Sequence, residues 1–243
     1  MYAFRTTTGP VDLAFTDRYG GVSDAPYDEL NLAIDGADDR RSLAENLRLL
    51  RADFAPDDEL VGLHQVHGAA VEVVERGWTG TRTDGRPDAD GLVTARRGVT
   101  LMVRAADCVP VLLADPVAGV VGAAHAGRPG LAAGIVPAVV GRMRRLGADR
   151  VTAWVGPHVC GACYEVPEAM RAEVGATVQA AVGTTSWGTP SLDLGAGVRS
   201  QLEAAGVGVV VASRCTRESA DLYSHRRDGE RAGRQAGLVR IRP

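Results

Sequence analysis

One thiol and two imidazoles lie in three short segments of the chain that could direct them into a common pocket. Cys108 lies in the segment ADCVP, His125 in HAG and His67 in QVHG. Zinc accepts one Cys and two His ligands in a tetrahedral site, and leaves a fourth position for water when the site is catalytic. Copper also accepts imidazole and thiolate, so the ligand types leave the metal open. Alternatively, Cys108 is a small buried hydrophobic residue and the histidines are hydrogen-bonded fillers of the core.

A predicted β-hairpin brings Cys108 and His125 together. An apolar run over 109–114 and a strand-like run over 119–124 flank a turn with proline at its second position, Asp115-Pro116-Val117-Ala118. If the turn is centred on its two middle residues, Cys108 lies opposite His125 on the same face, with β-carbons about 5 Å apart. That separation suits two ligands of one ion.

The third candidate ligand comes from the alternating stretch 63–68, which ends in glycine before the strand-like run Val71-Glu72-Val73-Val74. In an alternating stretch, His64 and His67 face opposite sides. Only one of these two histidines can therefore join Cys108 and His125.

Further short motifs follow one another in a fixed order along almost the whole chain. They are FTDRYGGVS from Phe15, LNL from Leu30, EN at Glu45, QVHG, DADGLVT from Asp88, ADCVP, HAG, GP at Gly156, CYEV from Cys163, YSHRRDG from Tyr223 and GRQ from Gly233. Together these motifs resemble the YfiH family, also called the laccase-domain or multicopper polyphenol oxidase family. The resemblance extends from about Phe15 to the C-terminus.

The resemblance implies a purine nucleoside phosphorylase that acts on adenosine and inosine, with methylthioadenosine phosphorolysis and adenosine deamination alongside. It also implies a catalytic zinc-type centre held by His67, Cys108 and His125, with His64 outside the first shell of ligands. The family's older name leaves a copper-dependent polyphenol oxidase as an alternative. A third alternative is a cysteine-dependent hydrolase, in which Cys108 is the nucleophile and His125 its base.

Substrate contacts are expected from Arg18, Asn31, Arg226 and Arg234, which lie in the family motifs. The segment around Arg226 is rich in Gly and Arg, so it could equally be a solvated cationic loop, and Arg227 could pair with Asp228. All 27 basic residues other than His are arginine, which excludes a Walker A loop and a Schiff-base lysine. Arginine forks suit phosphate well.

Two features of the resemblance remain open. The family usually continues HAG with Trp-Arg-Gly, whereas this chain has Arg128-Pro129-Gly130, so the aromatic wall and the guanidinium expected there are in doubt. If the site deaminates, a carboxylate must also shuttle protons, and those nearest the motifs are Asp90, Asp107 and Glu165.

Composition and patterning exclude several other classes of protein. A net charge of −3 with scattered arginines gives no footprint for nucleic acid, so purine nucleoside and phosphate are the expected partners. The N-terminus lacks the apolar run of a signal peptide and no stretch is apolar enough to span a bilayer, so we expect a cytoplasmic protein with reduced cysteines. Cys160 and Cys163 form a C-x-x-C, which can be a redox pair or half of a zinc site. The sequence does not indicate an oligomeric state.

The pattern of elements predicts an α+β fold with layered mixed sheets and helices outside, within one domain over 1–243. The fold implied by the family resemblance is similar to that of cysteine-dependent toxin deamidases. Helical spacing is present at 39–51, 131–146, 168–181 and 198–205. Besides the hairpin, strands are expected at 69–74, 101–104, 151–155 and 207–212.

Overall fold

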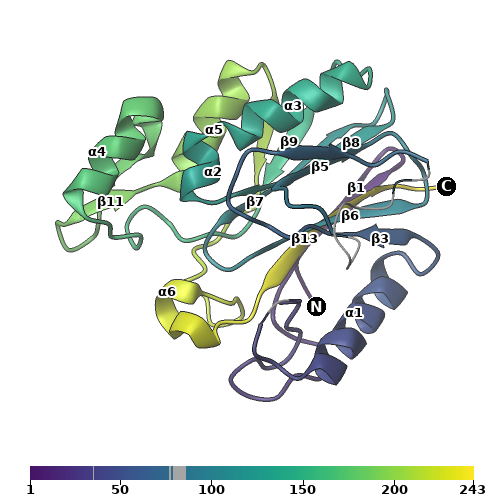
Figure 1. The fold of residues 1–243 in the computed structure, drawn as a ribbon, viewed down its shortest axis with the longest axis horizontal. Coiled ribbons are helices and arrows are strands. Elements are labelled where there is room, and N and C mark those ends of the chain that lie inside the picture. Colours follow the sequence, from purple (N-terminus) through teal and green to yellow (C-terminus); the bar gives the residue numbers. More distant parts are fainter. Residues whose placement is uncertain (35, 77, 79–85) are drawn as a thin grey trace.

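The computed structural model describes residues 1–34, 36–76, 78 and 86–243. Two large sheets stack face to face, and helices cover their outer faces (Figure 1). The five-stranded sheet has the order β1 (Tyr2–Thr8), β2 (Val11–Thr16), β13 (Gln235–Ile241), β6 (Val99–Ala105), β3 (Glu59–Val61). The six-stranded sheet has the order β12 (Gly208–Val211), β9 (Thr152–Val155), β7 (Val109–Asp115), β8 (Val120–Ala126), β5 (Gly91–Thr94), β4 (Val71–Val73).

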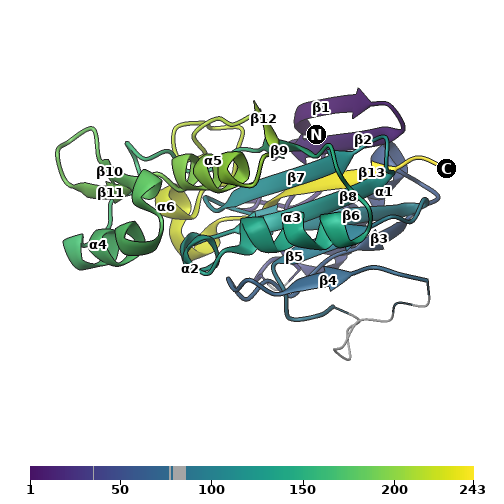
Figure 2. The ribbon, with the colours of Figure 1, turned by 90° about the horizontal axis from the view of Figure 1, so that it is seen from above.

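The helices lie on both outer sides of this sandwich. Helix α1 (Arg40–Phe54) covers the five-stranded sheet, while α2 (Arg128–Ala132), α3 (Ile135–Arg145) and α5 (Leu194–Ala204) cover the six-stranded sheet. At one end of the molecule, α4 (Glu168–Thr177) and the short helix η1 (Gln179–Ala181) accompany the two-stranded ribbon β10 (Val182–Thr184) and β11 (Pro190–Leu192) (Figure 2). Helix α6 (His225–Asp228) and η2 (Gly229–Arg231) precede β13. None of the helices in the described ranges is long and apolar enough to cross a membrane.

Strand alternation explains why the sandwich has three apolar layers. Leu113 on β7 packs toward the helices, whereas its neighbours Leu112 and Ala114 pack between the sheets. On β6, Leu101 packs between the sheets and the next residue, Met102, packs against α1. Because successive side chains on a strand point to opposite faces, a strand buried on both sides must be apolar throughout. The prediction of layered mixed sheets with helices outside is confirmed.

The expected elements are found with shifted boundaries. The helix expected at 39–51 runs from Arg40 to Phe54. It begins at Arg40 because the side chain of Asp39 accepts hydrogen bonds from two backbone N–H groups of the first turn. The single helix expected at 131–146 is wrong. It is divided into α2 and α3 by Gly134, whose φ of 82° lies in the left-handed region. No strand was predicted at β1, β2, β3, β5, β10, β11 or β13.

The predicted hairpin exists, but the predicted register is wrong by two residues. The structure pairs Asp115 with Val120 and Pro110 with His125, because the loop between the strands contains four residues. Asp115 Oδ1 accepts hydrogen bonds from the N–H groups of Val117 and Ala118, which stabilises this longer turn. Cys108 consequently lies just before β7, diagonal to His125 and not directly opposite it.

Candidate metal centre

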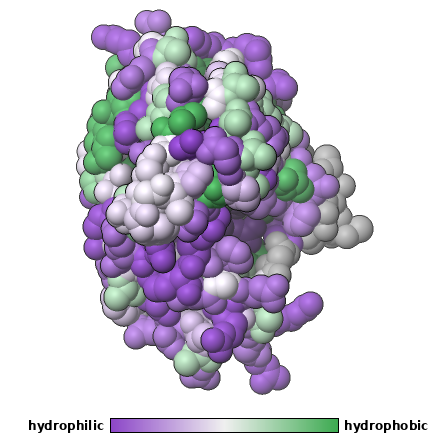
Figure 3. All heavy atoms as spheres, turned by 90° about the vertical axis from the view of Figure 1, so that its left-hand side faces the viewer, coloured by the Kyte–Doolittle hydropathy of each residue, from purple (hydrophilic) through white to green (hydrophobic). Residues whose placement is uncertain are grey.

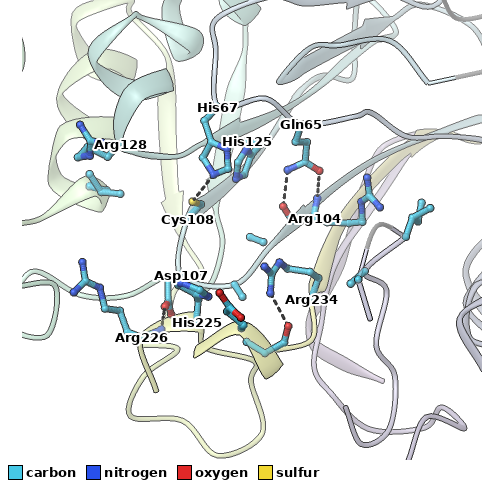
Figure 4. A pocket seen from close by; sticks show the side chains of 18 of the residues that line it. Gln65, His67, Arg104, Asp107, Cys108, His125, Arg128, His225, Arg226 and Arg234 are labelled. Atoms are coloured by element: carbon cyan, nitrogen blue, oxygen red, sulfur yellow. Dashed lines mark hydrogen bonds between the residues drawn. The ribbon is translucent and has the colours of Figure 1, made fainter. Parts of the chain in front are cut away.

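His67, Cys108 and His125, here called the Cys/His2 triad, converge on one point where β7 begins and β8 ends. Each residue offers one ligand atom, and these atoms all lie within 4.8 Å of one another. Cys108 Sγ lies 3.8 Å from His67 Nε2, and the two imidazole rings meet edge to face with centroids 4.8 Å apart (Figure 4). His125 is buried, Cys108 is half-buried and His67 is exposed, so the group opens toward solvent on one side.

Two segments bring the triad together with unusual backbone conformations. His67 has φ 60° and Asp107, which precedes Cys108, has φ 82°. Such angles are uncommon for residues other than glycine and are retained where the surroundings enforce them. For Asp107 the enforcing contacts are hydrogen bonds to its carboxylate from the Thr216 hydroxyl and from the backbone N–H of Arg226.

Asp90 organises the other half of the site. Its carboxylate is fully buried and accepts hydrogen bonds from the backbone N–H groups of Val66, His67 and Gly68 at 3.2, 3.0 and 2.7 Å. Burial alone would raise the pKa of Asp90, but the hydrogen bonds from His125 and from the N–H groups of Gly68 and His67 lower it. A charged carboxylate therefore holds the turn that carries His67.

The same carboxylate orients His125. The Nδ1 atom of His125 lies 2.8 Å from Asp90 Oδ1, so Nδ1–H donates a hydrogen bond to the charged carboxylate and Nε2 is left as the atom for a metal. The sequence marked Asp90 only as a proton-shuttle candidate, and its role behind the histidine was missed. His64 has the same kind of partner, Asp88 at 2.7 Å, but it does not belong to the group of converging ligand atoms.

The donor set fits a tetrahedral zinc-type ion. Bonds of about 2.3 Å to sulfur and 2.0–2.1 Å to nitrogen place the two ligand atoms about 3.6 Å apart, close to the 3.8 Å between Cys108 Sγ and His67 Nε2. Burial raises the pKa of Cys108, but the charge and hydrogen bond of His125, together with His67, outweigh this and lower it to about 6. The thiol is therefore readily converted to the thiolate that binds metals.

Glycines leave the space that the triad occupies. A β-carbon on Gly127 would lie 2.6 Å from the ring of His67 and 3.1 Å from Cys108 Sγ. On Gly130 it would lie 2.8 Å from the carbonyl oxygen of Gly68. The glycines at 127 and 130 are thus required by packing. Pro129 lies in the first turn of α2, where the N–H that proline lacks would have no partner within the helix.

The triad lies in a cavity of about 810 Å³ with arginines on two sides. Figure 4 shows Arg128 and Arg226 on one side of the triad and Arg104 and Arg234 on the other. The guanidinium of Arg226 lies 4.6 Å from the ring centroid of Tyr164, which also lines the cavity. At the level of α6 the surface is mostly hydrophilic (Figure 3). The cavity thus combines an open metal-ligating group with cations and an aromatic wall.

The predicted substrate contacts divide into two pairs. Arg226 and Arg234 line the cavity, whereas Arg18 and Asn31 are not among the described residues that line it. Arg18 donates to the backbone and side chain of Asp28 and stacks on Tyr223. Asn31 is fully buried and accepts a hydrogen bond from the backbone N–H of Arg234. Asn31 therefore supports the backbone of Arg234 from behind the cavity wall, whereas Asp28 and Tyr223, which Arg18 contacts, are not among the described residues that line the cavity.

Several other residues in or near the cavity have contacts that the sequence left open or did not indicate. Gln65 and Arg104 exchange hydrogen bonds through the backbone of Arg104, and Arg104 carried no sequence signal because it lies inside an apolar strand. Glu165, a proton-shuttle candidate from the sequence, accepts a hydrogen bond from the indole N–H of Trp187. Arg227 pairs with Asp228 at 2.8 Å, one of the two outcomes left open.

Comparisons with known proteins agree with this architecture. The model of the family described as multi-copper polyphenol oxidoreductase laccase matches residues 12–242. A purine nucleoside phosphorylase of Streptomyces coelicolor is 54% identical over 243 residues, covering 98% of this chain and 99% of the relative. The crystal structure of YlmD from Geobacillus stearothermophilus superposes with a TM-score of 0.88 at 32% identity, covering 100% of both chains. That of Bacillus licheniformis YfiH gives 0.84 at 28% identity, covering 96% and 93%.

Proposed function

Because the chain belongs to the YfiH family, described as multi-copper polyphenol oxidoreductase laccase, we propose that it is a purine nucleoside phosphorylase acting on adenosine and inosine. The observation that carries this proposal is the juxtaposition of the Cys/His2 triad with arginines in one cavity. Relatives named purine nucleoside phosphorylase support the reaction class. The cavity volume of about 810 Å³ lies within the range of small-molecule sites.

In phosphorolysis, phosphate attacks the anomeric carbon of the nucleoside while the purine departs. The site must hold the anion and stabilise negative charge on the leaving base. Arg226 and Arg234 are suitable phosphate ligands, since a guanidinium can donate two parallel hydrogen bonds to phosphate oxygens. Tyr164 offers an aromatic face beside Arg226. A zinc ion on His67, Cys108 and His125 would supply a Lewis acid with one open position.

The same cavity is proposed to accept methylthioadenosine and to deaminate adenosine. Deamination additionally requires a carboxylate that moves protons. Asp90 lies behind His125, and Asp107 is engaged by Thr216 and by the backbone of Arg226. Glu230 also lines the cavity, and we assign it as the proton-transfer candidate in place of the three named from sequence.

The test combines metal analysis with a phosphate-dependent assay. Purified protein incubated with adenosine or inosine should form free base and ribose 1-phosphate only when inorganic phosphate is present. His67→Ala should lose bound metal and activity, whereas the matched variant His64→Ala should keep the metal. Retention of metal in His67→Ala and its loss in His64→Ala would overturn the ligand assignment.

The same experiment separates the alternatives. A copper-dependent polyphenol oxidase would consume oxygen with phenols, respond to copper loading and ignore phosphate. A hydrolase that uses the Cys108 thiolate would remain active after chelation and would be inactivated by thiol alkylation. Either set of results, if no ribose 1-phosphate is formed, would refute the proposal of a phosphorylase.

A further inference from the structure

A second group of metal-ligating side chains lies outside the cavity. Cys160, Cys163, Cys215 and Glu218, here called the thiol cluster, each offer one ligand atom, and these atoms all lie within 4.8 Å of one another. Cys163 is buried, Cys160 and Cys215 are half-buried, and Glu218 is exposed. The described residues that line the cavity of the triad include none of these four.

Two loops assemble the thiol cluster. The backbone N–H groups of Cys163 and Tyr164 donate to the carbonyl oxygen of Cys160 at 3.0 Å, which closes the C-x-x-C into a tight turn. An isolated bridge pairs His158 with Cys215 and brings the second loop alongside. The N–H of Cys160 then points at Cys215 Sγ, 3.5 Å away.

The composition of the thiol cluster suits a bound cation. Three sulfur atoms and one carboxylate lie within 4.8 Å of one another, so a divalent ion at their centre would contact all four ligand atoms. Such an ion would also attract thiolates that would otherwise repel one another at this separation.

We propose that Cys160, Cys163, Cys215 and Glu218 bind one zinc ion as a structural site, separate from the ion of the Cys/His2 triad. Four protein ligands close a tetrahedral shell, as structural zinc sites require, whereas the triad supplies three. Thiolates select soft or borderline metals. The three thiol protons are released to solvent when the ion binds. A disulfide would use only two of the three sulfurs and leave Glu218 without a role.

The site would hold the loop that positions Cys108. Val159, next to Cys160, donates its N–H to the carbonyl oxygen of Asp107 at 3.1 Å. Thr216, next to Cys215, donates its hydroxyl to Asp107 Oδ1 at 2.5 Å. Val159 and Thr216, which are adjacent to two of the proposed ligands, therefore both hydrogen-bond to Asp107, the residue before Cys108. An ion that ties Cys160 to Cys215 fixes both contacts at once.

Zinc analysis of the full chain under reducing conditions tests the proposal. The wild-type protein should bind two equivalents, and both Cys163→Ser and the matched variant Cys108→Ser should bind one. The ion kept by Cys108→Ser reports the thiol cluster alone, whether or not the phosphorylase proposal holds. A single equivalent in the wild type that disappears in Cys108→Ser would overturn the inference. The inference would also be overturned if two of the cysteines form a disulfide, seen as a mass lower by two hydrogens, and the protein then binds no second ion.

A second measurement does not depend on how the Cys163 variant folds. Cobalt(II) bound to Cys108→Ser should show the sulfur-to-metal charge-transfer absorption of a multi-thiolate site, and adding zinc should remove it. Absence of that absorption would contradict the site. For the positioning role, Cys163→Ser should weaken zinc binding at the triad by on the order of 10-fold. Unchanged affinity there would show that the thiol cluster does not hold Asp107.

Discussion

Replacing Asp90 by Asn should weaken both the fold around the triad and its hold on metal. The carboxylate accepts from His67 N and His125 Nδ1 through Oδ1, and from Val66 N and Gly68 N through Oδ2. An amide has one acceptor and one donor group. If its NH2 faces Val66 and Gly68, two backbone donors lose their acceptor. If it faces the other side, His67 N loses its acceptor and His125 Nδ1 must accept.

The second arrangement is the less costly and carries the prediction. One buried N–H without a partner costs about 1–3 kcal/mol, so the free energy of unfolding should fall by about that amount. When Nδ1 of His125 accepts, the proton moves to Nε2, the atom that binds metal. Loss of such a carboxylate partner typically weakens metal affinity by about 10–100-fold.

Urea unfolding of the metal-free protein and zinc titration against a competing chelator measure the two effects. Asp88→Asn is the matched control, because Asp88 pairs with His64 at 2.7 Å on the exposed side. An exposed pair is worth about 0–1 kcal/mol, so the control should change little. If Asp90→Asn binds zinc as tightly as Asp88→Asn and unfolds at the same urea concentration, the assignment of Asp90 is refuted.

Three further predictions concern the geometry and chemistry of the cavity. Gly127→Ala should lose bound zinc, because its new β-carbon would overlap the ring and thiol of the triad, whereas Gly141→Ala, with open space around it, should bind zinc normally; equal zinc contents would contradict this packing argument. In metal-free protein, alkylation of Cys108 should accelerate as pH rises through about 6, where the thiolate forms. His125→Asn should move that midpoint upward, since burial alone raises the pKa, and an unmoved midpoint would rule out His125 as the cause. Arg226→Ala should raise the KM for phosphate and cost on the order of 2 kcal/mol in transition-state binding; unchanged kinetics with a lower Tm would make this arginine structural.

The sequence was sufficient where a short segment decides its own structure. Turn residues between two apolar runs predicted the hairpin that carries His125, and helical spacing predicted α1. The segments of His67, Cys108 and His125 also indicated one site, because a thiol and two imidazoles can together form the ligand set of a metal centre, or a nucleophile and its base. In each case the signal lies within a few residues and does not depend on distant contacts.

Only the tertiary structure decided how those segments meet. Asp90 serves His125 because β5 pairs with β8, and that pairing joins strands that no local pattern connects. The hairpin register followed from side-chain hydrogen bonds of Asp115 in the turn, which moved Cys108 away from the position opposite His125. Asn31 became a support of Arg234 because β13 returns next to β2 from the far end of the chain. These roles depend on which strands and helices pack against one another. That packing is determined by the total apolar surface buried in the three layers, which no single motif encodes.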